Sequence, residues 1–318
     1  MVRTWAPLFA ILSFVSAFHL PFERRQTNDG VHLAITPACG KLGGTPINAN
    51  AGVVTTGIKT LVAFGDSYTF GGKNDGGPLP PAVLIGTNPR AGNRATDGPV
   101  WAEDLASDLG ATIKDYAISG AVVNVTLWPS KAGASDFLHQ AALFLSQNNT
   151  LNPVTTLYAV FFGIKSDNFT LYVADGNHLP QAAADLLAQI ERLAAAPTNA
   201  KNILVVDDYG FGTHSAIGDA WKQAVFTGLI TLRAQGLNVA FVDFSPLWDA
   251  VLGTTPPGFA AFGYKNPGNC IPNADQTTLA GECATPLQSF YWLPSHPSKE
   301  THRIMADYVD FVLANCEA

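Results

Sequence analysis

The sequence has little charge and no excess of basic residues, which limits the classes of protein it can belong to. Only 14% of its 318 residues are Asp, Glu, Lys or Arg, and the formal net charge is −7. A chain with this balance and no basic stripe is a poor partner for a nucleic-acid phosphate backbone. We therefore expect no nucleic-acid partner.

Long hydrophobic runs and closely spaced cysteines are also missing. After the first residues, no segment reaches the about 18 uninterrupted apolar residues that suggest a transmembrane helix, so we expect no membrane span. No Cys-x-x-Cys pair is present, and no metal site or cofactor is implied. The hydrophobic content of 47% is enough to bury one large core.

The first residues are typical of an export signal. Arg3 precedes the apolar run LFAILSFVSAF, and residues 15–17 fit the small-residue cleavage pattern. We assign residues 1–17 as a signal peptide and expect a secreted, extracellular protein. Residues 18–25 form a propeptide if the basic pair Arg24-Arg25 is a processing site, and an ordinary exposed basic pair is the equal alternative.

Four cysteines fit that compartment, because an even number in an exported chain implies disulfides. Of the three possible connectivities we favour Cys270–Cys283, which closes a short loop, with Cys39–Cys316, which ties the two ends of the chain together. Export also makes N-glycosylation expected at one or more of three Asn-x-Ser/Thr sites: Asn124, Asn148 and Asn168.

Strand-like and helix-like segments alternate along most of the chain. Apolar runs rich in β-branched residues lie at 59–66, 112–119, 155–164, 201–208 and 237–244. Helical spacing of apolar residues marks 100–110, 134–147, 179–196, 215–236 and 298–315. This alternation predicts an α/β fold in one domain, with three layers (α/β/α) around a five-stranded, mainly parallel sheet.

Two long segments, 71–99 and 245–297, interrupt the alternation and are predicted to be irregular loops. Since sites form at the carboxyl ends of parallel strands, we expect residues 71–99 to form part of a substrate wall. We assign residues 26–58 as an N-terminal extension and residues 59–318 as the domain itself.

Four ordered blocks resemble the GDSL/SGNH esterase–lipase family. They are FGDSYTFGG (64–72), GPVWAEDLA (98–106), DYAISGA (115–121) and SHPSKETH (295–302). The middle two blocks also resemble the fungal and plant-type branch, which includes acetylesterases that act on carbohydrates. The resemblance covers roughly residues 59–312 and implies the flavodoxin-like fold of SGNH hydrolases.

The same resemblance implies roles for three residues. Ser67 matches the catalytic nucleophile, and its backbone N–H contributes to the oxyanion hole. Gly120 matches the second oxyanion donor, again through its backbone N–H. His296 matches the general base that takes the proton of the serine hydroxyl.

One departure from the family pattern concerns the group that orients this histidine. The family places Asp three residues before the catalytic His, where this chain has Leu293. We expect a backbone carbonyl, or a carboxylate such as Asp207 or Asp208, to orient His296 instead. Turnover slower than that of a full triad would follow.

A second departure concerns the third oxyanion donor. The family's Gly-x-Asn-Asp block aligns with FFGIKSDNF, in which Lys165 occupies the Asn position. A two-residue insertion would bring Asn168 there, but a glycan on Asn168 would exclude catalytic use. We therefore assign Lys165 to the oxyanion hole together with Ser67 and Gly120.

Together these residues predict a secreted serine esterase that removes short acyl groups, in particular acetyl, through an acyl-enzyme intermediate. We expect a monomer whose substrate is a small ester or an acetylated carbohydrate. Two alternatives stay open: a lipase or phospholipase acting on longer acyl chains, and a non-catalytic secreted carbohydrate-binding descendant of the fold.

Overall fold

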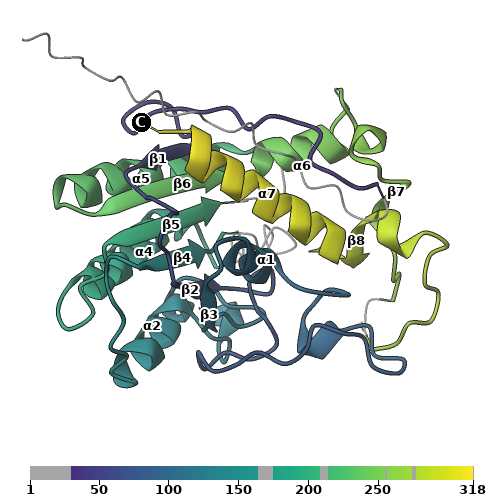
Figure 1. The fold of residues 1–318 in the computed structure, drawn as a ribbon, viewed down its shortest axis with the longest axis horizontal. Helices are drawn as coiled ribbons and strands as arrows, with labels where there is room; N and C mark the ends of the chain where they lie inside the picture. The colour runs from purple at the N-terminus through teal and green to yellow at the C-terminus, as the bar shows by residue number, and fades with distance from the viewer. Residues whose placement is uncertain (1–29, 164–174, 208–213, 255, 274–276, 318) are drawn as a thin grey trace, which may run out of the picture.

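A mainly parallel sheet between two layers of helices forms the centre of the molecule (Figure 1). The computed structural model describes residues 30–163, 175–207, 214–254, 256–273 and 277–317. The strand order is β1-β6-β5-β4-β2-β3. The five parallel strands are β2 (Thr60–Gly65), β3 (Thr112–Asp115), β4 (Thr156–Phe161), β5 (Asn202–Asp207) and β6 (Asn238–Asp243).

The central strands are covered on both faces, which explains their unbroken apolar sequences. Every residue of β4 and β5 is buried. The parallel register places Ala63 of β2 beside Asp115 of β3 and beside Ala159 of β4. The carboxyl ends of these strands therefore lie at one edge of the sheet.

The sheet has one strand more than the sequence predicts. β1 (Ala49–Ala51) pairs antiparallel with β6, with Asn50 opposite Ala240. It lies within residues 26–58, which we assigned as an extension of the domain. Three residues are too few for a periodic signal, and the pairing depends on a partner strand almost two hundred residues later, so local sequence could not reveal it.

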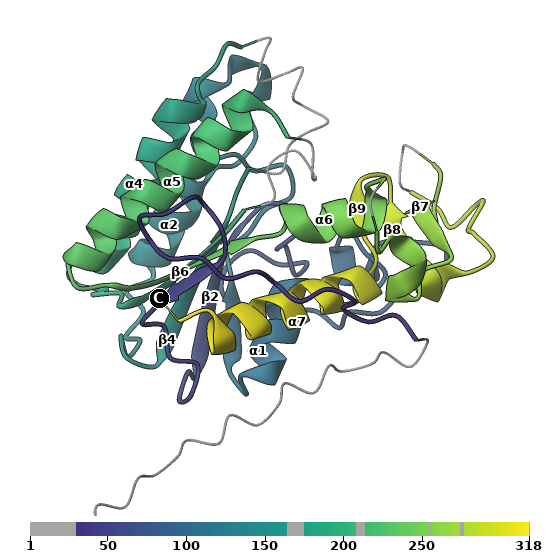
Figure 2. The ribbon, with the colours of Figure 1, turned by 90° about the horizontal axis from the view of Figure 1, so that it is seen from above.

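Helices cover both faces of the sheet (Figure 2). One core cluster joins the sheet to α1 (Trp101–Asp108), α6 (Ser245–Leu252) and α7 (Lys299–Asn315). The other joins it to α2 (Phe137–Ser146), α4 (Leu179–Ala194) and α5 (Ala216–Ala234). Five of these helices match the predicted segments. Among the helices of the described residues, none has the length and apolar character needed to cross a bilayer.

The segment 245–297 is more ordered than predicted. It contains α6 and a small sheet of β7 (Asn266–Asn269), β8 (Ser289–Leu293) and β9 (His296–Pro297). These strands are too short for a clear alternation of apolar and polar residues, and distant contacts stabilise them. Short 3-10 helices also occur: η1 (Ala91–Asn93), η2 (Val125–Leu127), η3 (Pro129–Lys131), η6 (Phe259–Phe262) and η7 (Pro286–Gln288).

Two disulfides hold the ends of the chain and the small sheet. Cys39 pairs with Cys316 across 277 positions, and Cys270 pairs with Cys283 across 13. These are the two pairings that the sequence favours. The first bond lies next to β1, where the N–H of Asn50 donates to the carbonyl of Cys316 over 2.7 Å.

A single guanidinium between α1 and α7 faces four carboxylates. Arg303 contacts Asp108 and lies 3.0 Å from Asp307, 3.7 Å from Asp104 and 3.9 Å from Asp310. Burial raises the pKa of Asp104 to about 7, and burial together with the neighbouring Asp108 raises the pKa of Asp310 to about 8. One cation does not neutralise four anions, so the folded protein retains protons here.

We predict that stability falls from about pH 4 to about pH 8 and then levels off. In this range the folded state keeps protons on Asp104 and Asp310 that the unfolded chain has already released, so each rise in pH favours unfolding. The decline ends once the pH passes the folded pKa values of about 7 and about 8. Thermal unfolding midpoints across this range measure the decline. Asp310→Asn should flatten it, whereas exposed Asp219→Asn on α5 should not. A decline of equal slope in Asp310→Asn would contradict the assignment.

Candidate active site

Ser67 lies in the turn that follows β2, at the carboxyl edge of the sheet. The carbonyl of Asp66 accepts hydrogen bonds from the N–H groups of Thr69 (3.1 Å) and Phe70 (3.0 Å). The Oδ1 atom of Asp66 accepts another from the N–H of Tyr68 over 3.0 Å. These bonds end the strand, and the Ser67 side chain, 6% exposed, lies just beyond it.

His296 reaches Ser67 from a hairpin 229 positions later in the chain. Its Nε2 atom lies 3.0 Å from Ser67 Oγ, and its Nδ1 atom lies 2.8 Å from the carbonyl oxygen of Pro294. A carbonyl oxygen only accepts hydrogen bonds, so Nδ1 carries the hydrogen and Nε2 presents its lone pair to the serine hydroxyl. This is the tautomer that a general base requires.

The hairpin between β8 and β9 explains why no carboxylate stands three residues before His296. Leu293 pairs directly with His296, and the turn between them is made by Pro294 and by Ser295, whose φ is +57°. Leu293 is fully buried in a small apolar cluster with Ala95, Cys270, Ile271 and Trp292. In this chain the position is a core position, and the turn itself brings the Pro294 carbonyl to Nδ1.

Tyr68 connects the nucleophile turn to the histidine hairpin. Its hydroxyl donates to the carbonyl of Ser295 over 2.7 Å, and its ring centroid lies 5.9 Å from that of His296. Tyr68, which follows Ser67, therefore binds Ser295, which precedes His296. Tyr68 lies within the FGDSYTFGG block, but its residue type alone does not indicate this role.

His302, the last residue of the SHPSKETH block, lies buried in the first turn of α7. Its Nδ1 accepts a hydrogen bond from the N–H of Trp101 at the start of α1, over 3.2 Å. Burial, and then the nearby His296, lower the pKa of His302 to about 3. It is therefore neutral at physiological pH and ties α1 to the helix that follows His296.

Gly120 lies just after β3, at the same edge of the sheet as Ser67. Its φ is +86°, a backbone conformation that favours glycine, and a Cβ atom there would meet no other atom within 4 Å. The N–H of Ile118, two residues earlier, donates to the carbonyl of Gly65 over 3.1 Å. The structure thus places the two expected oxyanion donors in the loops that follow β2 and β3, which are adjacent strands.

Asp115 at the end of β3 links the loops on either side of the site. Its Oδ2 accepts from the N–H of Gly71 over 2.5 Å, and its Oδ1 accepts from the N–H of Ala117 over 2.8 Å. Burial raises the pKa of this carboxyl well above its ordinary value. The sequence signal that could have identified it is an acidic residue within the predicted strand segment 112–119.

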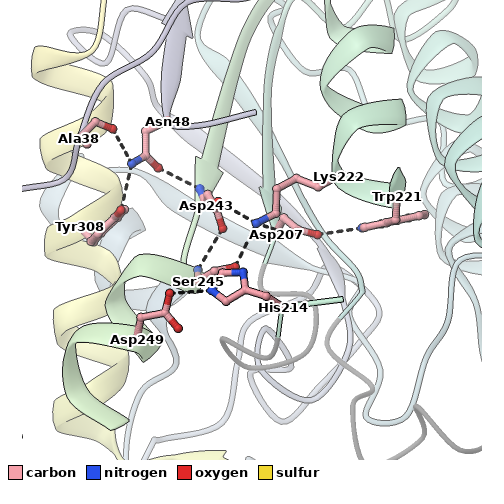
Figure 3. A network of polar contacts seen from close by, with 10 residues as sticks. All are labelled: Ala38, Asn48, Asp207, His214, Trp221, Lys222, Asp243, Ser245, Asp249 and Tyr308. Atoms are coloured by element: carbon pink, nitrogen blue, oxygen red, sulfur yellow. Dashed lines mark hydrogen bonds and ion pairs between the residues drawn. The ribbon is translucent and has the colours of Figure 1, made fainter. Parts of the chain in front are cut away.

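Asp207, one of the carboxylates considered for orienting His296, belongs to a separate polar network (Figure 3). Its Oδ1 accepts from Trp221 Nε1 over 2.8 Å, and its Oδ2 lies 3.9 Å from Lys222 Nζ. Lys222 Nζ also lies 2.8 Å from Asp243 Oδ2, at the end of β6. The other carboxylate considered, Asp208, lies outside the described residues.

Several other predicted residues can be placed only in part. Lys165 and Asn168 lie outside the described residues, so the third oxyanion donor stays a prediction. Asn148 is exposed after the end of α2, whereas the side chain of Asn124 donates to Asp185 over 2.7 Å. Within the described part of the chain, no group of three or more His, Cys, Asp or Glu side chains could hold a metal ion.

A serine hydroxyl paired with a correctly oriented histidine, at the carboxyl edge of a parallel sheet, defines a candidate serine hydrolase. The family model described as GDSL-like Lipase/Acylhydrolase matches residues 61–309. The chain belongs to this family. The match includes Ser67, Gly120 and His296.

Individual relatives cover different shares of the chain. An acetylesterase from Hypocrea jecorina is 30% identical over 136 residues, which are 37% of this chain and 38% of that protein. An acetyl xylan esterase from Geobacillus stearothermophilus is 16% identical, with a TM-score of 0.42, covering 83% of this chain and 99% of that one. A family two carbohydrate esterase from Clostridium thermocellum, solved with cellohexaose, is 15% identical, with a TM-score of 0.44 and coverage of 81% and 64%.

We predict that Leu293→Asp, which introduces the family's usual residue, does not increase kcat. The Pro294 carbonyl already accepts from Nδ1, and the new carboxylate would be buried among apolar side chains, which costs several kcal/mol. Leu293→Ala is the control for lost packing, which costs about 2–5 kcal/mol. Chemical denaturation should find the Asp variant less stable than the Ala variant. A stable Asp variant with higher kcat would contradict the carbonyl arrangement.

Proposed function

We propose that this protein is a secreted serine esterase that removes acetyl or other short acyl groups, with acetylated carbohydrates as its substrates. The observation that carries the proposal is the Ser67 Oγ–His296 Nε2 distance of 3.0 Å, with Nδ1 held by the Pro294 carbonyl. The hydrogen-bonded pair of Ser67 and His296 argues against a purely carbohydrate-binding role, since binding alone does not need a serine with an adjacent general base.

Acylation begins with attack of Ser67 Oγ on the carbonyl carbon of the ester, while His296 Nε2 takes the hydroxyl proton. The tetrahedral intermediate carries a negative oxygen, which the backbone N–H groups of Ser67 and Gly120 bind. His296 then donates its proton to the leaving alkoxide oxygen. The C–O bond of the ester breaks, leaving an acyl group on Ser67 and a free alcohol.

Deacylation repeats these steps with water. His296 Nε2 takes a proton from a water molecule, whose oxygen attacks the acyl carbon. The second tetrahedral intermediate collapses when the proton returns from His296 to Ser67 Oγ, releasing the carboxylic acid. Lys165 serves as the third oxyanion donor in this proposal.

The Pro294 carbonyl supplies part of what a triad aspartate supplies. It selects the same tautomer and ring orientation. However, its dipole stabilises the positive charge of the imidazolium formed in each step less than the full negative charge of a carboxylate does. We therefore expect the activity to depend on the correct tautomer, with weaker stabilisation of the protonated histidine and slower turnover than in a full triad.

Two features support a short acyl group. Ser67 is only 6% exposed, which favours a small acyl group over a bulky one. The curated relative that matches part of the chain is an acetylesterase. Carbohydrate as the alcohol component rests on the resemblance to the carbohydrate-acting branch of the family.

Two disulfides support export, because such bonds form in oxidising compartments. With the signal peptide of residues 1–17, they favour an extracellular enzyme. In a secretory pathway Asn148 is the more accessible acceptor, because it is exposed, whereas Asn124 is held by Asp185.

We predict that Ser67→Ala abolishes hydrolysis of p-nitrophenyl acetate, lowering kcat by about 10³-fold or more. The variant loses the nucleophile and retains the fold, since a small side chain replaces a small one. Initial rates and unfolding midpoints measure both effects. Ser146→Ala, an exposed position at the end of α2, is the control and should match the wild type. Equal rates in Ser67→Ala and wild type would refute the esterase.

We predict that kcat/KM falls along the series of p-nitrophenyl acetate, butyrate and octanoate. A nearly buried nucleophile accommodates two carbons more readily than eight, and the loss should reach about tenfold or more by octanoate. Release of p-nitrophenol measures each rate below the micellar concentration of the ester. A rise along the series would instead favour the lipase or phospholipase alternative.

A further inference from the structure

Gly65, two residues before Ser67, is the point where three segments around the site meet. Its carbonyl accepts from the N–H of Ile118 over 3.1 Å and from Nε2 of Gln140 over 2.8 Å. Its own N–H donates to Oε1 of Gln140 over 3.0 Å. The amide of Gln140 therefore binds Gly65 as a neighbouring strand would, at a position beyond the end of β3.

The surroundings of this contact leave little freedom. A Cβ atom on Gly65 would lie 2.7 Å from Thr69 Oγ1 and 2.9 Å from the carbonyl oxygen of Phe161. Gln140 is 1% exposed, so water does not replace its hydrogen bonds. Loss of the amide would leave polar groups of the backbone unpaired immediately before the nucleophile turn.

The helix that carries Gln140 is bound at its start to the segment that follows Gly120. The N–H of Phe137 donates to the carbonyl of Val122 over 3.0 Å. The N-cap residue Asp136 accepts from the N–H of Val125 through Oδ2 over 2.9 Å. The first turn of α2 thus holds the Gly120 segment, and the next turn holds the end of β2.

We propose that Gln140 is a positioning residue, which sets the separation of the Ser67 and Gly120 N–H groups through its two hydrogen bonds to Gly65. The inference rests on the proposed function, in which these N–H groups bind the oxyanion. The oxyanion forms only in the transition states and intermediates of the reaction. A change in the separation therefore lowers kcat and leaves KM unchanged.

Gln140→Met tests this role, because it removes both hydrogen bonds, adds no charge and does not titrate. Gln140→Glu is a second variant with a smaller change of shape. Its ionised form places a carboxylate oxygen against the carbonyl of Gly65, whereas its protonated form restores the donor.

Asn50 provides a matched control, because it makes the same kind of contact far from the site. It is 2% exposed on β1, with three strands between it and β2. Its Oδ1 accepts from the N–H of Val53 over 2.8 Å, and its Nδ2 donates to the carbonyls of Val53 (2.8 Å) and Leu313 (2.7 Å). Asn50→Asp therefore makes the same chemical change in a buried amide.

With p-nitrophenyl acetate, the folded Gln140 variants should lose about 30-fold in kcat, with KM within about twofold of wild type. Asn50→Asp should show a comparable fall in the unfolding midpoint with kcat retained. Wild-type kcat in folded Gln140→Met, or an equal loss of kcat in Asn50→Asp, would overturn the positioning role. Hydrolysis by Ser67→Ala at the wild-type rate would instead overturn the proposed function on which it rests.

Discussion

The contact between Ser67 Oγ and His296 Nε2 is the interaction on which the arrangement of this site depends, and it joins residues 229 positions apart. Each partner lies on a separate unit: the serine on a turn at the edge of the main sheet, and the histidine on a small hairpin. The Tyr68 hydroxyl, bonded to the carbonyl of Ser295, holds the two units together. The Cys270–Cys283 disulfide stabilises the β8–β9 hairpin, because Cys270 packs in the same apolar cluster as Leu293.

Aspartates at the strand ends give the carboxyl edge of the sheet its shape. Asp66, Asp115 and Asp243 each accept a hydrogen bond from the N–H group two residues later, which turns the chain away from the sheet. Asp207 instead binds the indole of Trp221 on α5. All four carboxylates are buried, so their role here is to satisfy backbone and side-chain donors where the strands stop. Because these four carboxylates have other partners, the hydrogen-bond acceptor for Nδ1 of His296 is the carbonyl oxygen of Pro294.

The order of the elements followed from the sequence, because five apolar runs and five amphipathic segments alternate with clear periods. Strand β1 and helix α6 did not, since one is too short and the other begins a segment whose order depends on distant contacts. Among the candidate site residues, Ser67, Gly120 and His296 could be selected from the sequence because they lie in blocks that resemble those of the family. Gln140 was not, although a polar residue within the apolar stripe of a helix is a signal that could have suggested a buried partner.

By itself, the sequence determined the layered α/β architecture, the family and the absence of an acid at position 293, because these depend on local periodicity and on residue identity. Only the tertiary structure decided what replaces that acid. The choice between the carbonyl of Pro294 and the carboxylate of Asp207 depends on how a hairpin turns and which side chains a helix presents to a strand end. Such distances arise from contacts between segments far apart in the chain, and local sequence carries no record of them.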